Sequence, residues 1–136
     1  TIYVTVSQAS FIYVYDIQPD GLVRLIFPNA YSQSNFVSAG MHTLPDGLYK
    51  FTVAPPAGVE QLQIFASPSP LQLAPQSYGE PFPMIAGDPE SATGQIQGHI
   101  MGITPEPLWA TAWASFTIVG QGYGFTPPTT TPAILP

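Results

Sequence analysis

The sequence predicts an all-β fold, and three observations lead to this fold class. The 136 residues include 17 Pro and 12 Gly, which favour frequent turns and disfavour long helices. Several short runs alternate apolar and polar residues with the period of two that is typical of half-buried strands. Hydrophobic residues make up 45% of the chain and aromatic residues 12%, enough to build the core of one domain.

Two strands are expected near the start of the chain. Within residues 2–6, apolar side chains alternate with Tyr3 and Thr5, so one face of this strand is expected to be buried. Residues 11–17 are apolar on both faces. We therefore expect this second run to be a central strand that is covered on both sides.

A tight turn is expected at residues 19–21, where the sequence reads Pro-Asp-Gly. Proline presets φ for the first turn position, and glycine accepts the positive φ that closes a hairpin. The chain then returns as a strand, with Val23, Leu25 and Phe27 expected on one face.

Two further strands are expected after a second Pro-Asp-Gly turn at residues 45–47. Residues 48–53 alternate in the manner of a strand and end at a Pro-Pro pair, which cannot donate to a β-ladder. Residues 61–66 form the next run, with Leu62 and Ile64 facing inward.

The composition changes in the second half of the chain. Residues 67–107 form an insertion with eight Pro, within which residues 90–103 have the spacing of a short helix or an irregular loop. Residues 109–119 return to a strand with small Ala side chains on one face. We therefore assign residues 1–120 to the β domain and residues 121–136 to an extended Gly/Pro/Thr-rich tail.

Charged residues are scarce, and this scarcity excludes several classes of partner. They make up 7% of the chain, and the formal net charge is −6. With Arg24 and Lys50 as its two basic residues, the chain cannot neutralise a nucleic-acid backbone or an anionic membrane surface. No apolar run approaches the ~18 residues of a membrane-spanning helix. The absence of Cys removes disulfides, thiol catalysis and Cys-ligated zinc.

The polar residues do not form a recognisable metal or cofactor site. His42 and His99 are the two histidines, whereas a zinc site needs three or four ligands, so both are expected in loops or on the surface. Asp16, Asp20 and Asp46 lie near predicted turns but lack the spacing of a calcium-binding loop. We therefore expect turn roles for Asp20 and Asp46, and neither a metal nor a cofactor.

No catalytic constellation is evident either. Glu80 with Asp88, or Asp88 with Glu90, could in principle pair as a general acid and a general base. Their surroundings supply no nucleophile, however, and no G-x-S-x-G elbow occurs. We expect these side chains to be solvated loop carboxylates. Residues 120–124 contain three alternating glycines without the spacing of a nucleotide loop, and we expect a hinge there. The protein is therefore not expected to be an enzyme.

Aromatic residues at alternating strand positions suggest a different kind of site. Tyr13, Tyr15, Trp109 and Trp113 form a candidate platform for a sugar or a partner protein if they face outward. The competing interpretation is that these rings lie on a second, covered face of a sheet.

Residues 13–29 carry a resemblance to a known family. Their Tyr13-x-Tyr15 pair, Asp20-Gly21 turn and closing Phe27-Pro28-Asn29 resemble the strand–turn–strand signature of a widespread bacterial family of unknown function. Other matching elements span about residues 2–119 and lie at 35–40, 44–53, 55–60 and 109–119. The resemblance implies an immunoglobulin-like β-sandwich of about seven strands, typical of exported or envelope proteins, and it supplies no catalytic residues.

The tail is the most unusual segment. No side chain from Leu108 to Pro136 is charged, and the tail ends on apolar residues. Such a segment is a suitable donor for an exposed sheet edge or a groove on a neighbouring subunit. The expected assembly residues are aromatic, proline and aliphatic side chains, namely Tyr123, Phe125, Pro127, Pro128, Ile134 and Leu135.

Two functions follow as expectations. The first is a non-catalytic exported structural protein that self-assembles at the cell surface as a filament, surface layer or coat. In that case a homo-oligomer or polymer forms through the tail and a sheet edge. The alternative is an extracellular glycan- or peptide-binding module that uses surface aromatics. The first residue, Thr1, is preceded by neither Met nor a signal segment, which fits a processed mature chain or a trimmed one.

Overall fold

The protein is all-β in the residues that the computed structural model describes, which are 1–51, 57–71, 73–75, 77–86, 110–118, 129–130 and 133–135. No helix occurs within these ranges. The strands are β1 (Ile2–Val6), β2 (Ser10–Ile17), β3 (Val23–Phe27), β4 (Phe36–Val37), β5 (Gly40–Leu44), β6 (Gly58–Ser67), β7 (Met84–Ala86), β8 (Ala110–Ile118), β9 (Thr129–Thr130) and β10 (Ala133–Leu135).

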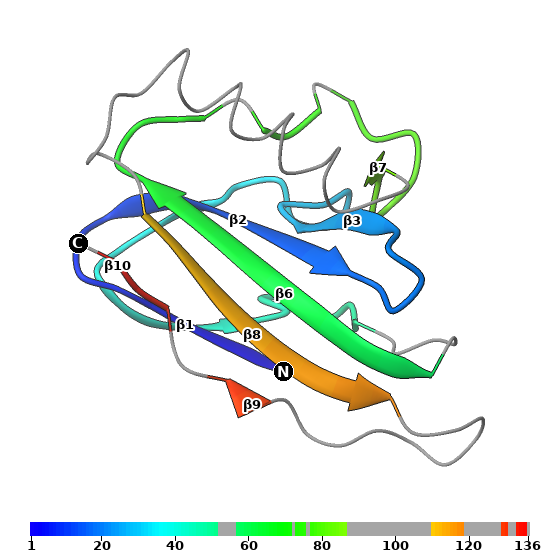
Figure 1. Cartoon of the computed structure of the whole chain (residues 1–136). Helices are drawn as coiled ribbons and strands as arrows, with labels where there is room; N and C mark the ends of the chain where they lie inside the picture. Colours follow the sequence, from blue (N-terminus) through cyan, green and yellow to red (C-terminus); the bar gives the residue numbers. More distant parts are fainter. Residues whose placement is uncertain are drawn as a thin grey trace.

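The strands form two sheets (Figure 1). The small sheet has the order β10-β1-β5, and the large sheet has the order β7-β3-β2-β6-β8-β9, with β4 also paired to β2. The pairing of β1 with β10 is parallel, and the other pairings between described strands are antiparallel. In Figure 1, β10 lies beside β1, and β6 lies between β2 and β8.

The main core lies between the two sheets. The small sheet contributes the inward-facing side chains of β1, which are Ile2, Val4 and Val6, and Leu44 of β5. The large sheet contributes buried apolar side chains of three strands, namely Ile12, Val14, Ile26, Phe27, Leu62, Ile64 and Ala66. Burial of such apolar surface is the dominant favourable term in folding. It holds the two sheets together as two layers around this core.

A second apolar cluster covers the outer face of the large sheet. Tyr13 and Tyr15 of β2 pack there with Phe65 of β6 and with Leu71 and Leu73, which follow β6. The backbone amide of Leu71 donates a hydrogen bond to the Tyr13 hydroxyl at 3.0 Å, which ties the covering segment to the sheet. The expectation of a central strand covered on both faces is thus confirmed for β2.

The turn between β2 and β3 has the predicted geometry. Gly21 has a φ of 89°, in the region that glycine favours, and its amide donates a hydrogen bond to the Gln18 carbonyl at 2.8 Å. The Asp20 carboxylate accepts a hydrogen bond from the Leu22 amide at 3.2 Å, as expected for an Asp in a turn.

The expected face of Phe27 is wrong, because β3 contains an irregularity. Tyr15 pairs with Leu25, whereas the adjacent Val14 pairs with Phe27, so Ile26 is an extra residue on β3. A bulge of this kind reverses the alternation of side chains beyond it. Phe27 therefore joins the core between the sheets, on the face opposite to Leu25.

The strand expected at residues 48–53 is also wrong over its described part. Residues 48–51 are not a strand, and the strand in this region is β5, upstream of the turn. β5 pairs along the whole of β1 and ends at Leu44, because Pro45 has no amide hydrogen to continue the ladder. The alternation of aromatic residues after the turn reflects ring packing, described below.

The later strands agree with expectation where they are described. Leu62 and Ile64 of β6 lie in the core, and Ala112, Ala114 and Phe116 of β8 pack against the same core. The segment expected as a short helix or loop at residues 90–103 lies outside the described residues. The short strand β7, within the Pro-rich insertion, was not anticipated by its local pattern.

Candidate functional site

The C-terminal tail adds a strand to each sheet. β9 pairs with β8 at the edge of the large sheet, and β10 pairs in parallel with β1 in the small sheet. The register aligns Ala133 with Val4, Ile134 with Thr5 and Leu135 with Val6. Of the expected assembly residues, Tyr123, Phe125, Pro127 and Pro128 lie outside the described residues.

The contact between β10 and β1 is short and uncharged. It consists of three aligned residue pairs, and parallel pairing is slightly weaker per residue than antiparallel pairing. Each backbone hydrogen bond contributes a net ~0.5–1.5 kcal/mol. The sequences of β1, β5 and β10 contain no Asp, Glu, Lys or Arg, although charges commonly protect sheet edges. Besides this pairing with β1, β10 lies close to β8 of the large sheet.

The expected ligand platform is not assembled at the surface. Tyr13 and Tyr15 are 3% and 1% exposed, because they lie under the segment that covers the outer face of the large sheet. The Tyr15 ring meets Phe65 edge to face at 5.9 Å, and burial raises the pKa of its hydroxyl. Trp113 of β8 is 49% exposed, and Trp109 lies outside the described residues. The two tyrosines are therefore core residues, as the competing interpretation held.

A different group of rings gathers at the surface, and we call it the aromatic cluster: Tyr31, Tyr49, Phe51 and Phe82. Tyr31 stacks on Tyr49 with ring centroids 5.4 Å apart and an interplanar angle of 22°. Phe82 lies 6.0 Å from Tyr31, 6.4 Å from Tyr49 and 5.8 Å from Phe51. Tyr31 is 63% exposed, whereas the other three rings are half-buried. The cluster thus supports one outward ring on three others.

Buried Asn29 fixes the two tyrosines of the cluster. Its side-chain amide donates to the Ile26 carbonyl at 2.7 Å and to the Tyr49 hydroxyl at 3.1 Å. Its side-chain carbonyl accepts from the backbone amides of Tyr31 at 2.9 Å and Ser32 at 3.0 Å. One fully buried side chain therefore sets the backbone under Tyr31 and the position of Tyr49.

Asp46 lies at the polar rim of the cluster. Its Oδ1 accepts a hydrogen bond from the Tyr49 hydroxyl at 2.9 Å, and its Oδ2 accepts one from the Ser32 hydroxyl at 2.8 Å. Burial raises the pKa of Tyr49, Asn29 opposes this shift by a hydrogen bond, and the charge of Asp46 adds to it. The neutral Tyr49 hydroxyl is therefore kept as a donor to Asp46.

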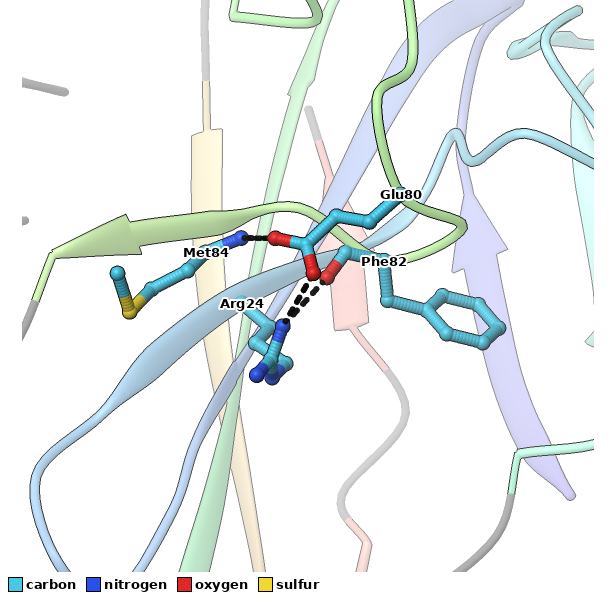
Figure 2. Close-up of polar contacts among 4 residues, drawn as sticks. All are labelled: Arg24, Glu80, Phe82 and Met84. Carbon is cyan, nitrogen blue, oxygen red and sulfur yellow. Dashed lines mark hydrogen bonds and ion pairs between the residues drawn. The ribbon is translucent and has the colours of Figure 1, made fainter.

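An ion pair holds the segment that carries Phe82 (Figure 2). Arg24 Nη1 lies 3.4 Å from Glu80 Oε2 and donates a hydrogen bond to the Phe82 carbonyl at 2.9 Å. Glu80 Oε1 accepts from the Met84 amide at 3.0 Å. Glu80, expected to be a solvated loop carboxylate, lies in a loop with its side chain 52% exposed and also pairs with Arg24, because the Pro-rich insertion folds back on β3.

The backbone reinforces this attachment. The Leu25 amide donates to the Pro83 carbonyl at 3.0 Å, and the Ala30 amide donates to the Pro81 carbonyl at 3.1 Å. In Figure 2, the Phe82 ring extends away from Arg24. The half-exposed ion pair contributes at most ~1 kcal/mol by itself. Together with the backbone contacts, it positions Phe82 against the other rings.

Asp16 and Glu60 form a carboxyl pair on adjacent strands of the large sheet. Asp16 Oδ1 and Glu60 Oε2 are buried and have no protein partner within the described residues. Burial, together with a hydrogen bond to Glu60, raises the pKa of Asp16 to about 9. The raised pKa favours the protonated form of Asp16, which lies within β2, in the strand expected at residues 11–17.

Potential metal-binding side chains in the described part of the chain do not gather in groups of three or more. His42 Nε2 lies 2.6 Å from the Ser38 carbonyl, and His99, Asp88 and Glu90 lie outside the described residues. The same part of the chain contains no helix long and apolar enough to cross a membrane.

Fold and sites together define an all-β, two-sheet domain with a short C-terminal strand paired to β1 and a surface aromatic cluster. Residues 1–70 match the family model of a domain of unknown function (DUF4384), and the chain belongs to this family. The match covers β1 to β6, so the expected family element at residues 109–119 lies outside it. No curated protein and no solved structure gives a significant match to the chain.

Proposed function

We propose that the chain is a non-catalytic, exported structural module that self-assembles at the cell surface, with the tail of one copy docking on its neighbour. The observation that carries this proposal is the short parallel contact of β10 with β1. The segment that completes the small sheet belongs to the tail, aligns with β1 over three residue pairs and also lies close to β8. A neighbouring copy offers an identical site for that segment.

Exchange between copies is favoured by the symmetry of the interactions. A tail docked on a second copy makes the same backbone bonds as a tail docked on its own domain, which is the basis of domain swapping. Residues 119–128 connect β8 to β9 and contain Gly120, Gly122, Gly124, Pro127 and Pro128, a composition typical of linkers. Head-to-tail exchange generates filaments or layers, whereas reciprocal exchange generates closed dimers.

The finer fold assignment belongs to the same proposal. We assign the two packed sheets to the immunoglobulin-like sandwich class, with the Pro-rich insertion as an addition to it. Two sheets that enclose one core, with a long antiparallel large sheet, support this assignment. An exported location is in keeping with the uncharged edges of the small sheet, which are suited to being covered in an assembly.

Removal of the tail tests this proposal. Deleting residues 121–136 removes both tail strands, whereas deleting Pro136 alone leaves β9 and β10 present and serves as the matched control. We expect electron microscopy and light scattering to detect polymers of the full chain and of the control, and monomers of the tail deletion. Unchanged assembly of the tail deletion would overturn the proposal.

A second candidate function is the binding of an extracellular glycan or peptide by surface aromatics. It is favoured by Trp113, a half-exposed indole on the outer face of β8. Indole rings suit such sites because they combine a large apolar face with one hydrogen-bond donor. Replacing Trp113 with Ala is expected to lower the affinity of such a ligand, and an unchanged affinity would remove Trp113 from the site.

A further inference from the structure

Tyr31 has an unusual environment for an exposed aromatic residue. One of its faces is stacked on Tyr49, and Phe82 approaches it from a second side. The ring nevertheless remains 63% exposed, so a broad apolar surface faces the solvent. An exposed ring held by two other rings has little freedom left to lose when a ligand stacks on it.

The support beneath Tyr31 is rigid in several independent ways. Asn29 binds the backbone amide of Tyr31 and the hydroxyl of Tyr49. Arg24 holds the backbone of Phe82 through a hydrogen bond to its carbonyl. Hydrogen bonds from β3 and the loop after it therefore position the aromatic cluster. The exposed side of its outer ring, Tyr31, faces the solvent.

The rim of the platform is polar and contains both donors and acceptors. Asp46 is exposed, and its two oxygens are oriented by the hydroxyls of Ser32 and Tyr49. A carboxylate that already accepts two hydrogen bonds keeps further lone pairs for a ligand hydroxyl. A pyranose ring fits this combination, since it has an apolar C–H face and hydroxyl groups around its edge.

We infer that the aromatic cluster is a carbohydrate-binding platform on which Tyr31 stacks a neutral pyranose ring, with Asp46 accepting hydrogen bonds from its hydroxyls. This inference rests on the second candidate function and adds to it a second surface, separate from Trp113. Anionic ligands are disfavoured by Asp46 and by the net charge of −6. Proline-rich peptides bind in grooves between aromatic rings. The rings of Tyr31 and Tyr49 are stacked on each other and therefore leave no such groove between them.

An array of immobilised neutral and acidic oligosaccharides, probed with the full chain, tests the inference. We expect binding to at least one neutral glycan. Tyr31→Ala is expected to lower the affinity for that glycan at least tenfold, and Tyr31→Phe, which keeps the ring, to lower it less than threefold. Tyr3→Ala, which removes an exposed ring of β1 outside the aromatic cluster, is the control and is expected to leave the affinity unchanged. A urea midpoint of Tyr31→Ala close to that of the parent chain confirms that the variant is folded.

The outcomes distinguish this site from the function on which it rests. Binding that is lost in Trp113→Ala and kept in Tyr31→Ala overturns the aromatic cluster as the site but retains glycan binding. Absence of binding to every glycan overturns both. Binding of a Lys-rich peptide in place of any glycan also overturns the inference, because the ring and the carboxylate then serve a cationic partner. None of these results depends on whether the tail is exchanged.

Discussion

Asp16 on β2 and Glu60 on β6 carry neighbouring carboxyl groups, and burial together with the proximity of Glu60 raises the pKa of Asp16. Burial raises the pKa of Asp16 to about 9, Glu60 adds to the shift, and Arg24, its partner on β3, opposes it. In the unfolded chain an Asp ionises near pH ~3.9. The folded chain therefore holds a proton that the unfolded chain releases, so stability falls as the pH rises from about 4 to about 9.

Replacing Asp16 with Asn removes this pH dependence, because the amide stays neutral and still donates to Glu60. Between pH 5.5 and pH 8, we expect the free energy of unfolding of the parent chain to fall by on the order of 1–2 kcal/mol, after allowance for solvent screening. Urea unfolding of Asp16→Asn is expected to vary much less. Glu80→Gln, which neutralises a half-exposed carboxylate, is the control and is expected to retain the slope. Equal slopes of the unfolding free energy against pH for the parent chain and for Asp16→Asn would contradict the raised pKa of Asp16.

The core between the sheets predicts that two residues of β5 contribute very differently to the free energy of unfolding. Leu44 is 2% exposed and packs between the sheets, whereas Met41 on the same strand faces outward. Leu44→Ala leaves a cavity and is expected to cost about 2–5 kcal/mol of unfolding free energy. Met41→Ala is expected to change it by less than ~0.5 kcal/mol, as surface substitutions do. Similar urea midpoints for the two variants would show that β5 does not pack on the large sheet.

The hydrogen bonds of Asn29 are predicted to hold the rings of the aromatic cluster in fixed positions. Asn29→Ala removes four hydrogen bonds and leaves buried backbone groups without partners, at an expected cost of about 2–3 kcal/mol. Near-ultraviolet circular dichroism of the tyrosines is expected to weaken at the same time. Ser32→Ala removes one exposed hydroxyl and is expected to leave both readings nearly unchanged. A full tyrosine signal in Asn29→Ala would mean that ring packing alone orders the cluster.

Local sequence patterns were sufficient for strands whose faces alternate regularly. Alternation in residues 2–6 and a doubly apolar run at residues 11–17 correctly indicated β1 and β2, and the Pro-Asp-Gly turn indicated the hairpin. The predicted face of Phe27 is wrong, because the bulge changes the alternation of side chains and no local sequence pattern indicates it. Tyr49 and Phe51 alternate like strand residues but serve a cluster of rings.

The sites depended on contacts that no local pattern encodes. The aromatic cluster joins Tyr31, Tyr49 and Phe51 with Phe82 of the Pro-rich insertion, which is held there by Arg24 and by backbone hydrogen bonds to β3 and the loop after it. The scarcity of charge did single out the tail, but its parallel register on β1 is a pairing between the two ends of the chain. The buried state of Tyr13 and Tyr15 was one of two open interpretations, because periodicity does not reveal what covers a sheet face.

Tail exchange between copies is tested most directly by an interchain disulfide. The chain has no Cys, so Thr5→Cys in one sample and Ile134→Cys in another, which are aligned in the register of β1 and β10, supply the only thiols. After the two samples are mixed and oxidised, we expect a disulfide between Thr5→Cys and Ile134→Cys chains on a non-reducing gel. A mixture of Met84→Cys, at the exposed strand β7, with Ile134→Cys is the control and is expected to give only background. If the Thr5→Cys and Ile134→Cys mixture gives no more product than this control, while the double variant closes within one chain, the tail stays on its own domain and the proposed assembly is wrong.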